Sequence, residues 1–258
     1  MLSENNIFDV GAFDGLDGLI LAIKNPNTMV HAFEANPDLI EVIKNNKNKI
    51  EKYKKIEINN YKIINNAVSD KNSDLIFNIA KNPTVSSLNE FSKNIDKTWP
   101  GYREAHCTVI KKIEVEGITL EKYCIDNEIK KINYLHIDTQ GSDLKVLKGL
   151  KNKLDIVDQG VLEAAVDEAT SLYELNHTID QTKKFLQLNN FEILKVENVD
   201  KNIDKEKNIY FKKKNLNNNF KINKKYNIRY YKRLTNNQLS LKDKFFDKLK
   251  DLFFIKSY

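Results

Sequence analysis

The stretch IFDVGAFDG at residues 7–15 joins a short apolar run to a turn that contains two glycines. The apolar run Ile7–Val10 predicts a buried strand that ends at Gly11, and the apolar pattern of Asp17–Ile23 predicts a helix. Glu34, nineteen residues beyond Gly15, ends a second predicted strand. A strand, a glycine turn, a helix and an acidic residue in this order are typical of a nucleoside-binding unit in a parallel α/β sheet.

Apolar runs and helical patterns continue to alternate along the chain, which favours a parallel α/β sheet. Further strands are expected at 61–68, 75–79, 109–115, 133–138, 159–166, 191–197 and 208–213. Helices are expected after the cap residue Asn36, at 119–127, at 142–147 and from the capping box formed by Thr178 and Gln181. Residues 82–107 are long for a connection, so this segment is expected either to be a functional lid or to contain a helix.

Composition excludes several classes of protein. The 258 residues are 41% hydrophobic and 30% charged, which suits one folded domain with a full core and excludes a wholly disordered chain. Two cysteines cannot form a disulfide scaffold and suit a reducing compartment. Apolar runs of the roughly 20 residues that span a bilayer are absent, as is a secretion signal at the start. A cytoplasmic protein is expected.

Charge divides the chain into an acidic body and a basic tail. Residues 1–211 hold 28 basic and 33 acidic residues, whereas 212–258 hold 14 basic and three acidic ones. We therefore expect a domain at 1–213 and a basic tail at 214–258. Residues 226–233 mix aromatic and basic side chains, and 241–253 have the spacing of an amphipathic helix.

Three partners are open for this tail helix. The first is its own domain or a second copy of the chain in a homo-oligomer. The second is an anionic inner membrane surface, with the protein peripheral to it. The third, nucleic acid, is disfavoured because a single lysine-rich tail is a weak signal.

The residues of the turn at 9–15 narrow the choice of cofactor. A dinucleotide fingerprint would need glycine at positions 13 and 16, where Phe13 and Leu16 stand. S-adenosylmethionine has a ribose and an amino-acid end but no pyrophosphate, so an acid at Asp9 could face its ammonium group. The alternative is a tight structural turn with an exposed Glu34. Either the glycine turn or the acidic residue on its own would favour this alternative.

The sequence resembles the FkbM-type S-adenosylmethionine-dependent methyltransferases. The blocks that carry the resemblance are DVGAFDG at 9–15, HAFEANP at 31–37, NAVSD at 66–70 and HIDTQGSDLKVLKG at 136–149, with weaker ones at 118–123 and 161–164. They span about four-fifths of the chain, from residue 7 to 211. Three positions depart from the family pattern: His136 replaces a lysine, Asp143 replaces a glutamate, and Phe13 stands where asparagine is common.

The resemblance implies a fold and a donor site. The fold would be doubly wound and Rossmann-like, with a mostly parallel seven-stranded sheet whose last strand is antiparallel. Asp9, Gly11, Ala12 and Gly15 would hold the methionine end of the donor. The ribose would lie on Glu34 and Ala35, and the adenine would face Asn66 and Ala67.

Catalysis would centre on Asp138, at the carboxyl end of a strand near the transferring methyl group. His136 and Glu163 are further candidates for the base, although a packed strand histidine is the more ordinary role for His136. A divalent cation between Asp138 and Glu163 is disfavoured because the two show no recognisable ligand spacing. Trp99, Tyr102 and Arg103 in the lid segment could contact a sugar.

The resemblance favours methyl transfer to a hydroxyl of a small molecule, of a saccharide or glycolipid type. N-methylation and nucleic-acid methylation are alternatives. A non-catalytic module that binds a partner through its tail is another.

Overall fold

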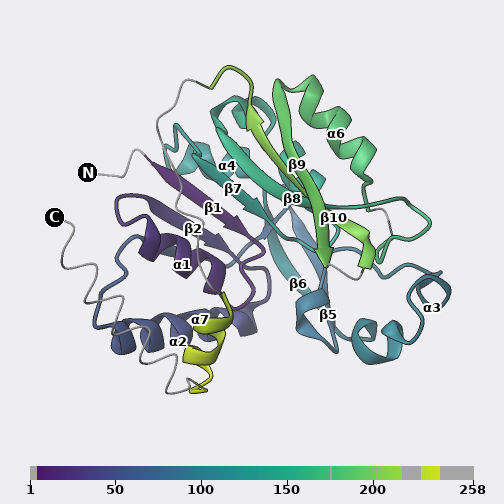
Figure 1. Ribbon diagram of the computed structural model, residues 1–258, viewed down its shortest axis with the longest axis horizontal. Helices are drawn as coiled ribbons and strands as arrows, with labels where there is room; N and C mark the ends of the chain where they lie inside the picture. Colours follow the sequence, from purple (N-terminus) through teal and green to yellow (C-terminus); the bar gives the residue numbers. More distant parts are fainter. Residues whose placement is uncertain (1–4, 175, 201–202, 217–227, 239–258) are drawn as a thin grey trace.

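A seven-stranded sheet forms the centre of the computed structural model, which describes residues 5–174, 176–200, 203–216 and 228–238 (Figure 1). The strands are β1 (Asn6–Val10), β2 (Met29–Phe33), β3 (Tyr61–Ile64), β4 (Ala67–Val68), β5 (Asp74–Ala80), β6 (Val109–Ile118), β7 (Tyr134–Ile137), β8 (Gln159–Ala165), β9 (Phe191–Asp200) and β10 (Ile203–Lys213). The α-helices are α1 (Leu16–Lys24), α2 (Pro37–Lys54), α3 (Ile95–Thr98), α4 (Leu120–Asp126), α5 (Asp143–Lys148), α6 (Ile179–Leu188) and α7 (Ile228–Thr235). Short helical turns η1 (Pro83–Val85), η2 (Arg103–Cys107) and η3 (Lys151–Ile156) complete the list.

The strand order confirms the predicted doubly wound fold. The order is β3-β2-β1-β7-β8-β10-β9, and β10 runs antiparallel to both of its neighbours. The chain builds outward from β1 to β3 and later returns to place β7 on the other side of β1. Parallel sheets bind ligands at such a reversal, outside the carboxyl ends of the strands. The fold thus directs attention to the ends of β1, β2 and β7.

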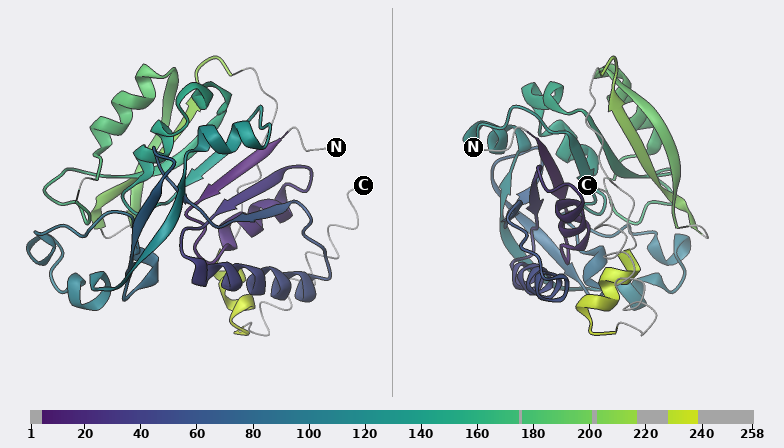
Figure 2. Two further views of the ribbon diagram at one scale, coloured as in Figure 1. Left: turned by 180° about the vertical axis from the view of Figure 1, so that it is seen from behind. Right: turned by 60° about the vertical axis from the view of Figure 1, so that its left-hand side comes forward.

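Successive strand residues point to opposite faces, so helices can cover the sheet on both sides. Ile7 of β1 packs with α1, α2 and α7, whereas Phe8 packs with α4, α5 and α6 on the other face. Figures 1 and 2 show these two helical layers. Asn36 caps α2 by accepting a hydrogen bond from the backbone N–H of Asp38, and the capping box that begins α6 is also present.

The predicted strand at 61–68 is two strands in two sheets. Residues 61–64 form β3 in the main sheet, whereas Ala67 and Val68 form β4 and pair with β6. Asn65 fixes the bend because its side chain donates to the backbone carbonyls of Glu34 and Ala35. The second sheet has the order β4-β6-β5 and lies beside the carboxyl ends of β1 and β2 (Figure 1).

The segment 82–107 contains helical turns, as one of the two predictions for it required. η1, α3 and η2 lie within it. Its apolar residues form a separate small core with Leu172 and Tyr173. Both cysteines, Cys107 and Cys124, are buried thiols without a disulfide.

The described part of the tail packs on the domain through α7, which contacts α1 and α2 (Figure 2). The predicted amphipathic helix at 241–253 lies outside the described residues, so its partner and the domain boundary at 213 stay predictions. None of the helices that the structure describes has the length and apolar character needed to cross a bilayer.

Candidate active site

The turn after β1 needs glycine at its first position. Gly11 has a φ of 87°, and a Cβ atom there would lie 1.8 Å from the backbone oxygen of Asp138. The backbone N–H groups of Gly11 and Ala12 both donate to the carbonyl of Phe33, at 3.0 and 2.9 Å. The turn therefore ties the ends of β1, β2 and β7 together, and a side chain at position 11 would push them apart.

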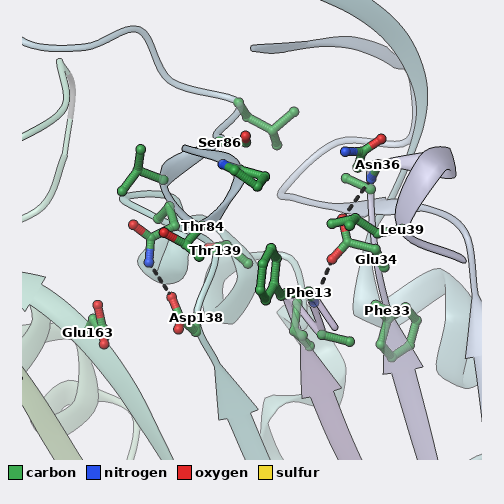
Figure 3. A pocket seen from close by; sticks show the side chains of 18 of the residues that line it. Phe13, Phe33, Glu34, Asn36, Leu39, Thr84, Ser86, Asp138, Thr139 and Glu163 are labelled. Atoms are coloured by element: carbon green, nitrogen blue, oxygen red, sulfur yellow. Dashed lines mark hydrogen bonds between the residues drawn. The ribbon is translucent and has the colours of Figure 1, made fainter. Parts of the chain in front are cut away.

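Glu34 closes this turn from β2. One oxygen accepts a hydrogen bond from the backbone N–H of Phe13 at 2.7 Å, and the other accepts one from Asn36 at 2.8 Å (Figure 3). Burial raises the pKa of the Glu34 carboxyl to about 7. Each carboxylate oxygen can accept a second hydrogen bond, so the group retains capacity for ligand hydroxyls.

Asp9 and His136 form a pair across β1 and β7, where they are register partners. The Nδ1 atom of His136 lies 2.8 Å from one carboxylate oxygen of Asp9. Burial opposes a charge on the imidazole, but the hydrogen bond and the charge of Asp9 outweigh it and raise the pKa of His136 to about 9. His136 is therefore a cation at neutral pH and is a poor candidate for a general base.

A cavity of about 380 Å³ opens beyond these strand ends. Sites for small molecules have volumes of roughly 300–1,000 Å³. The cavity is lined by ten of the eleven residues that the sequence proposes for donor binding and catalysis: Asp9, Gly11, Ala12, Glu34, Ala35, Asn66, Ala67, His136, Asp138 and Glu163. The remaining residue, Gly15, is the N-cap of α1 and has a φ of 75°. A Cβ atom at Gly15 would meet the side chains of Ile43 and Tyr61.

Asp138 is held by Gln140, which was not predicted as a site residue from the sequence. The side-chain amide of Gln140 donates to Asp138 at 2.6 Å and accepts a hydrogen bond from the hydroxyl of Tyr173 at 2.8 Å. Tyr173 is fully buried. These two hydrogen bonds orient the Asp138 carboxylate in the cavity. The only feature of the sequence that pointed to them was the position of Gln140 beside a glycine in the block 136–149.

Asp143, Glu163 and Glu206 lie close enough to Asp138 for its charge to raise their pKa values. Asp143 accepts hydrogen bonds from the Thr139 hydroxyl at 3.0 Å and from the backbone N–H of Glu163 at 3.2 Å. Glu206, on β10, lines the cavity with Glu163 and was not anticipated from the sequence. Burial raises the pKa values of Asp143 and Glu206 to about 7, and the charge of Asp138 adds to both shifts.

Asp138 and Glu163 differ in their electrostatic surroundings. Burial raises the pKa of both, but the nearby His136 cation lowers the pKa of Asp138 and does not act on Glu163. Asp138 and Asp143 raise the pKa of Glu163 further. The pKa of Glu163 is therefore raised by burial and by like charges, whereas His136 opposes the rise at Asp138. Two carboxyl groups in such different surroundings are the kind of pair that can divide the roles of base and acid.

The segment 82–107 supplies the opposite wall. Trp99 and Tyr102 line the cavity, and the Trp99 indole donates to the backbone oxygen of Thr170 at 2.9 Å. Arg103 does not line it, because its guanidinium pairs with Asp96 at 2.8 Å. Within the described ranges no three carboxyl, histidine or cysteine side chains converge in a way that could hold a metal ion.

One further lining residue, Lys232, comes from α7 in the tail. From the sequence, residues 226–233 were expected only to combine aromatic and basic side chains. Its closeness to the turn shows in the pKa of Asp14, which burial raises and Lys232 lowers.

These residues match a known family. Residues 9–193 match the profile of the Methyltransferase FkbM domain, which is most of the chain. The chain belongs to this family. The match includes every residue proposed above for donor binding and catalysis, whereas Glu206 and Lys232 lie beyond it.

Several solved structures align with most of the chain at low identity. TrmK from M. capricolum, solved with S-adenosyl-homocysteine, is 12% identical over 84% of this chain and 66% of its own, with a TM-score of 0.44. Methyltransferase FkbM from Methylobacillus flagellatus is 12% identical over 82% of this chain and 44% of its own, with a TM-score of 0.47.

Magnesium protoporphyrin IX methyltransferase from Synechocystis, solved with bound SAM, is 8% identical over 80% of this chain and 69% of its own, with a TM-score of 0.42. This chain thus spans less than two thirds of the first two structures. No curated protein matches the sequence significantly.

Proposed function

We propose that this protein transfers a methyl group from S-adenosylmethionine to a hydroxyl group of a small, polar, saccharide-like acceptor. The observation that carries the proposal is the single cavity that joins Glu34 and the 9–15 turn to the Asp138 carboxylate. Family membership supports the reaction type, and the cavity supports the arrangement of donor and acceptor.

The donor half fits a nucleoside with an amino-acid end. Glu34 has acceptor capacity for the two ribose hydroxyls. Leu39, Ala67 and Val68 line the same cavity beside Asn66 and offer apolar surface for a base. Asp9 and Asp14 in the 9–15 turn, and Asp17 just after it, line the cavity. These three acidic residues would attract the ammonium group of the methionine end.

The donor supplies a methyl group made electrophilic by a sulfonium. The protein must hold the acceptor oxygen in line with it and take up the hydroxyl proton. Asp138 suits both tasks, since His136 and Gln140 lower its pKa against the effect of burial and the Gln140 amide also fixes its carboxylate. The oxygen–carbon bond forms as the carbon–sulfur bond breaks, the proton passes to Asp138, and S-adenosylhomocysteine leaves with the methyl ether.

The acceptor half suits a molecule rich in hydroxyl groups. Glu163 and Glu206 present oxygens that can accept hydrogen bonds, and Trp99 and Tyr102 present aromatic surface. Carboxyl groups beside aromatic rings also suit a cationic amine. This cluster therefore makes N-methyl transfer the second candidate.

The donor assignment is tested by calorimetric titration with S-adenosylhomocysteine. We expect the unaltered protein to bind one equivalent and Glu34→Gln to bind roughly tenfold more weakly, because one charged acceptor of a hydrogen bond is lost. The single carbonyl oxygen of Gln can still accept from the backbone N–H of Phe13 or of Asn36, and thermal unfolding checks that the variant folds. Absence of binding to folded, unaltered protein would contradict the proposal.

The acceptor assignment is tested with labelled S-adenosylmethionine and two panels, neutral sugars and primary amines. Product from sugars, lost in Asp138→Asn while S-adenosylhomocysteine still binds, supports O-methylation. Product from amines alone would replace it with N-methylation. Activity on nucleic acid would fall steeply with salt, whereas transfer to a neutral sugar would not.

A further inference from the structure

Helix α7 is anchored on the domain by side chains on one of its faces. Tyr231 and Leu234 are buried with the apolar residues of α1 and β1, at 6% and 4% exposure. Lys49 of α2 donates to the backbone oxygen of Thr235 at 2.8 Å, at the carboxyl end of α7. A cation stabilises this end of a helix. Lys54 of α2 lies 5.6 Å from the centre of the Tyr231 ring. These contacts fix α7 against the face of α1 and α2.

Lys232 stands next to the anchored Tyr231 along α7 and lines the cavity. Lys232 is solvent-exposed and lies close enough to Asp14 to lower its pKa. Among the described residues that line the cavity, it is the one lysine or arginine, beside seven aspartates and glutamates. The other cation there, His136, is already paired with Asp9.

The methionine end of the donor presents a carboxylate as well as an ammonium group. The carboxylate needs a cation or backbone N–H donors, as anions do at helix beginnings. The N–H groups of the 9–15 turn are largely engaged. The N–H groups of Gly11 and Ala12 donate to the carbonyl of Phe33, and that of Phe13 donates to the Glu34 carboxylate. The N–H of Gly15 donates to the carbonyl of Ala12, and that of the next residue, Leu16, donates to the Asp14 carboxylate. The turn, which is also rich in carboxylates, is therefore ill suited to bind an anion by itself.

We propose that α7 completes the donor site and that the Lys232 ammonium group pairs with the carboxylate of the donor's methionine end. The proposal rests on the proposed function, because it concerns the same cavity. It adds a donor-binding residue from outside residues 9–193, which match the family profile. It also gives the basic tail a role within the protein: the contacts of Tyr231 and Leu234 set the position of Lys232.

The test compares two ligands and two variants of the full chain by calorimetry. S-adenosylhomocysteine carries the carboxylate, and S-adenosyl-3-thiopropylamine is the same molecule without it. Lys232→Met removes the charge at the cavity, whereas Arg229→Met removes an exposed charge from the same helix at a residue that does not line the cavity. Both positions are exposed, so both variants should fold, and thermal unfolding checks this.

We expect Lys232→Met to weaken S-adenosylhomocysteine binding roughly fivefold, the change that about 1 kcal/mol produces. The decarboxylated ligand should bind Lys232→Met and unaltered protein within twofold, and Arg229→Met should match the unaltered protein for both ligands. Equal S-adenosylhomocysteine affinity in Lys232→Met and unaltered protein would overturn this inference and leave the proposed function intact. So would an equal loss for both ligands. Failure of the unaltered protein to bind either ligand would instead overturn the proposed function.

Discussion

Substitution of Gly11 by alanine should destabilise the protein far more than the same change at Gly101. Both glycines have positive φ, 87° and 75°, so alanine at either position has a backbone cost of about 1 kcal/mol. At Gly101 a Cβ atom meets nothing within 4 Å, whereas at Gly11 it would lie 1.8 Å from the backbone oxygen of Asp138. That oxygen belongs to the main chain, so β1 and β7 must separate to relieve the overlap.

Separation would break the hydrogen bond from the Asp138 N–H to the Val10 carbonyl, now 2.9 Å, and disturb the packing around it. We expect Gly11→Ala to lower the free energy of unfolding by roughly 3–5 kcal/mol and Gly101→Ala by about 1 kcal/mol. Urea unfolding followed by far-UV circular dichroism measures both. A Gly11→Ala protein that unfolds at the same urea concentration as Gly101→Ala would refute the reasoning about this close approach.

Three further predictions concern charge. Asp138→Asn should lower the rate of methyl transfer by roughly 10²–10⁴-fold, the typical contribution of a general base, and leave S-adenosylhomocysteine affinity within a few-fold. Asp9 raises the pKa of His136 to about 9, so the stability that this pair contributes is present below pH 6.5 and is lost as pH rises through 9. In His136→Gln the urea midpoint should therefore change less between pH 7 and 10 than in the unaltered protein. An unchanged pH dependence of the midpoint would count against the pair. Burial lowers the pKa of His31 to about 4, so stability should decline as pH falls from 6.5 to 4; His31→Gln should reduce that decline, as thermal unfolding across this range would reveal.

The sequence predicted those parts of the site whose requirements are local. A strand, a glycine turn and a helix are encoded by neighbouring residues, because the turn needs positive φ at Gly11 and the helix needs its own apolar stripe. The place of Glu34 follows from the next strand, since parallel strands end at the same edge of a sheet. The doubly wound fold and its antiparallel strand β10 were predicted with the help of the family blocks.

Other parts depend on contacts between distant residues. The pairing of Asp9 with His136 follows from the register of β1 and β7, which lie 127 positions apart at these residues. The split of residues 61–68 depends on β6, which gives Ala67 and Val68 a different partner strand. Helical periodicity in residues 226–233 could not reveal that Lys232 faces the cavity, because that depends on which face of the domain α7 covers.

The most direct test of the central claim is a crystal structure of the protein with S-adenosylhomocysteine. We predict that the ligand lies in the cavity beyond β1 and β2, with both ribose hydroxyls hydrogen-bonded to Glu34 and the sulfur facing Asp138. The amino-acid end should lie over the 9–15 turn. Ligand bound elsewhere, or a ribose that makes no contact with Glu34, would contradict the account of this cavity as the donor site.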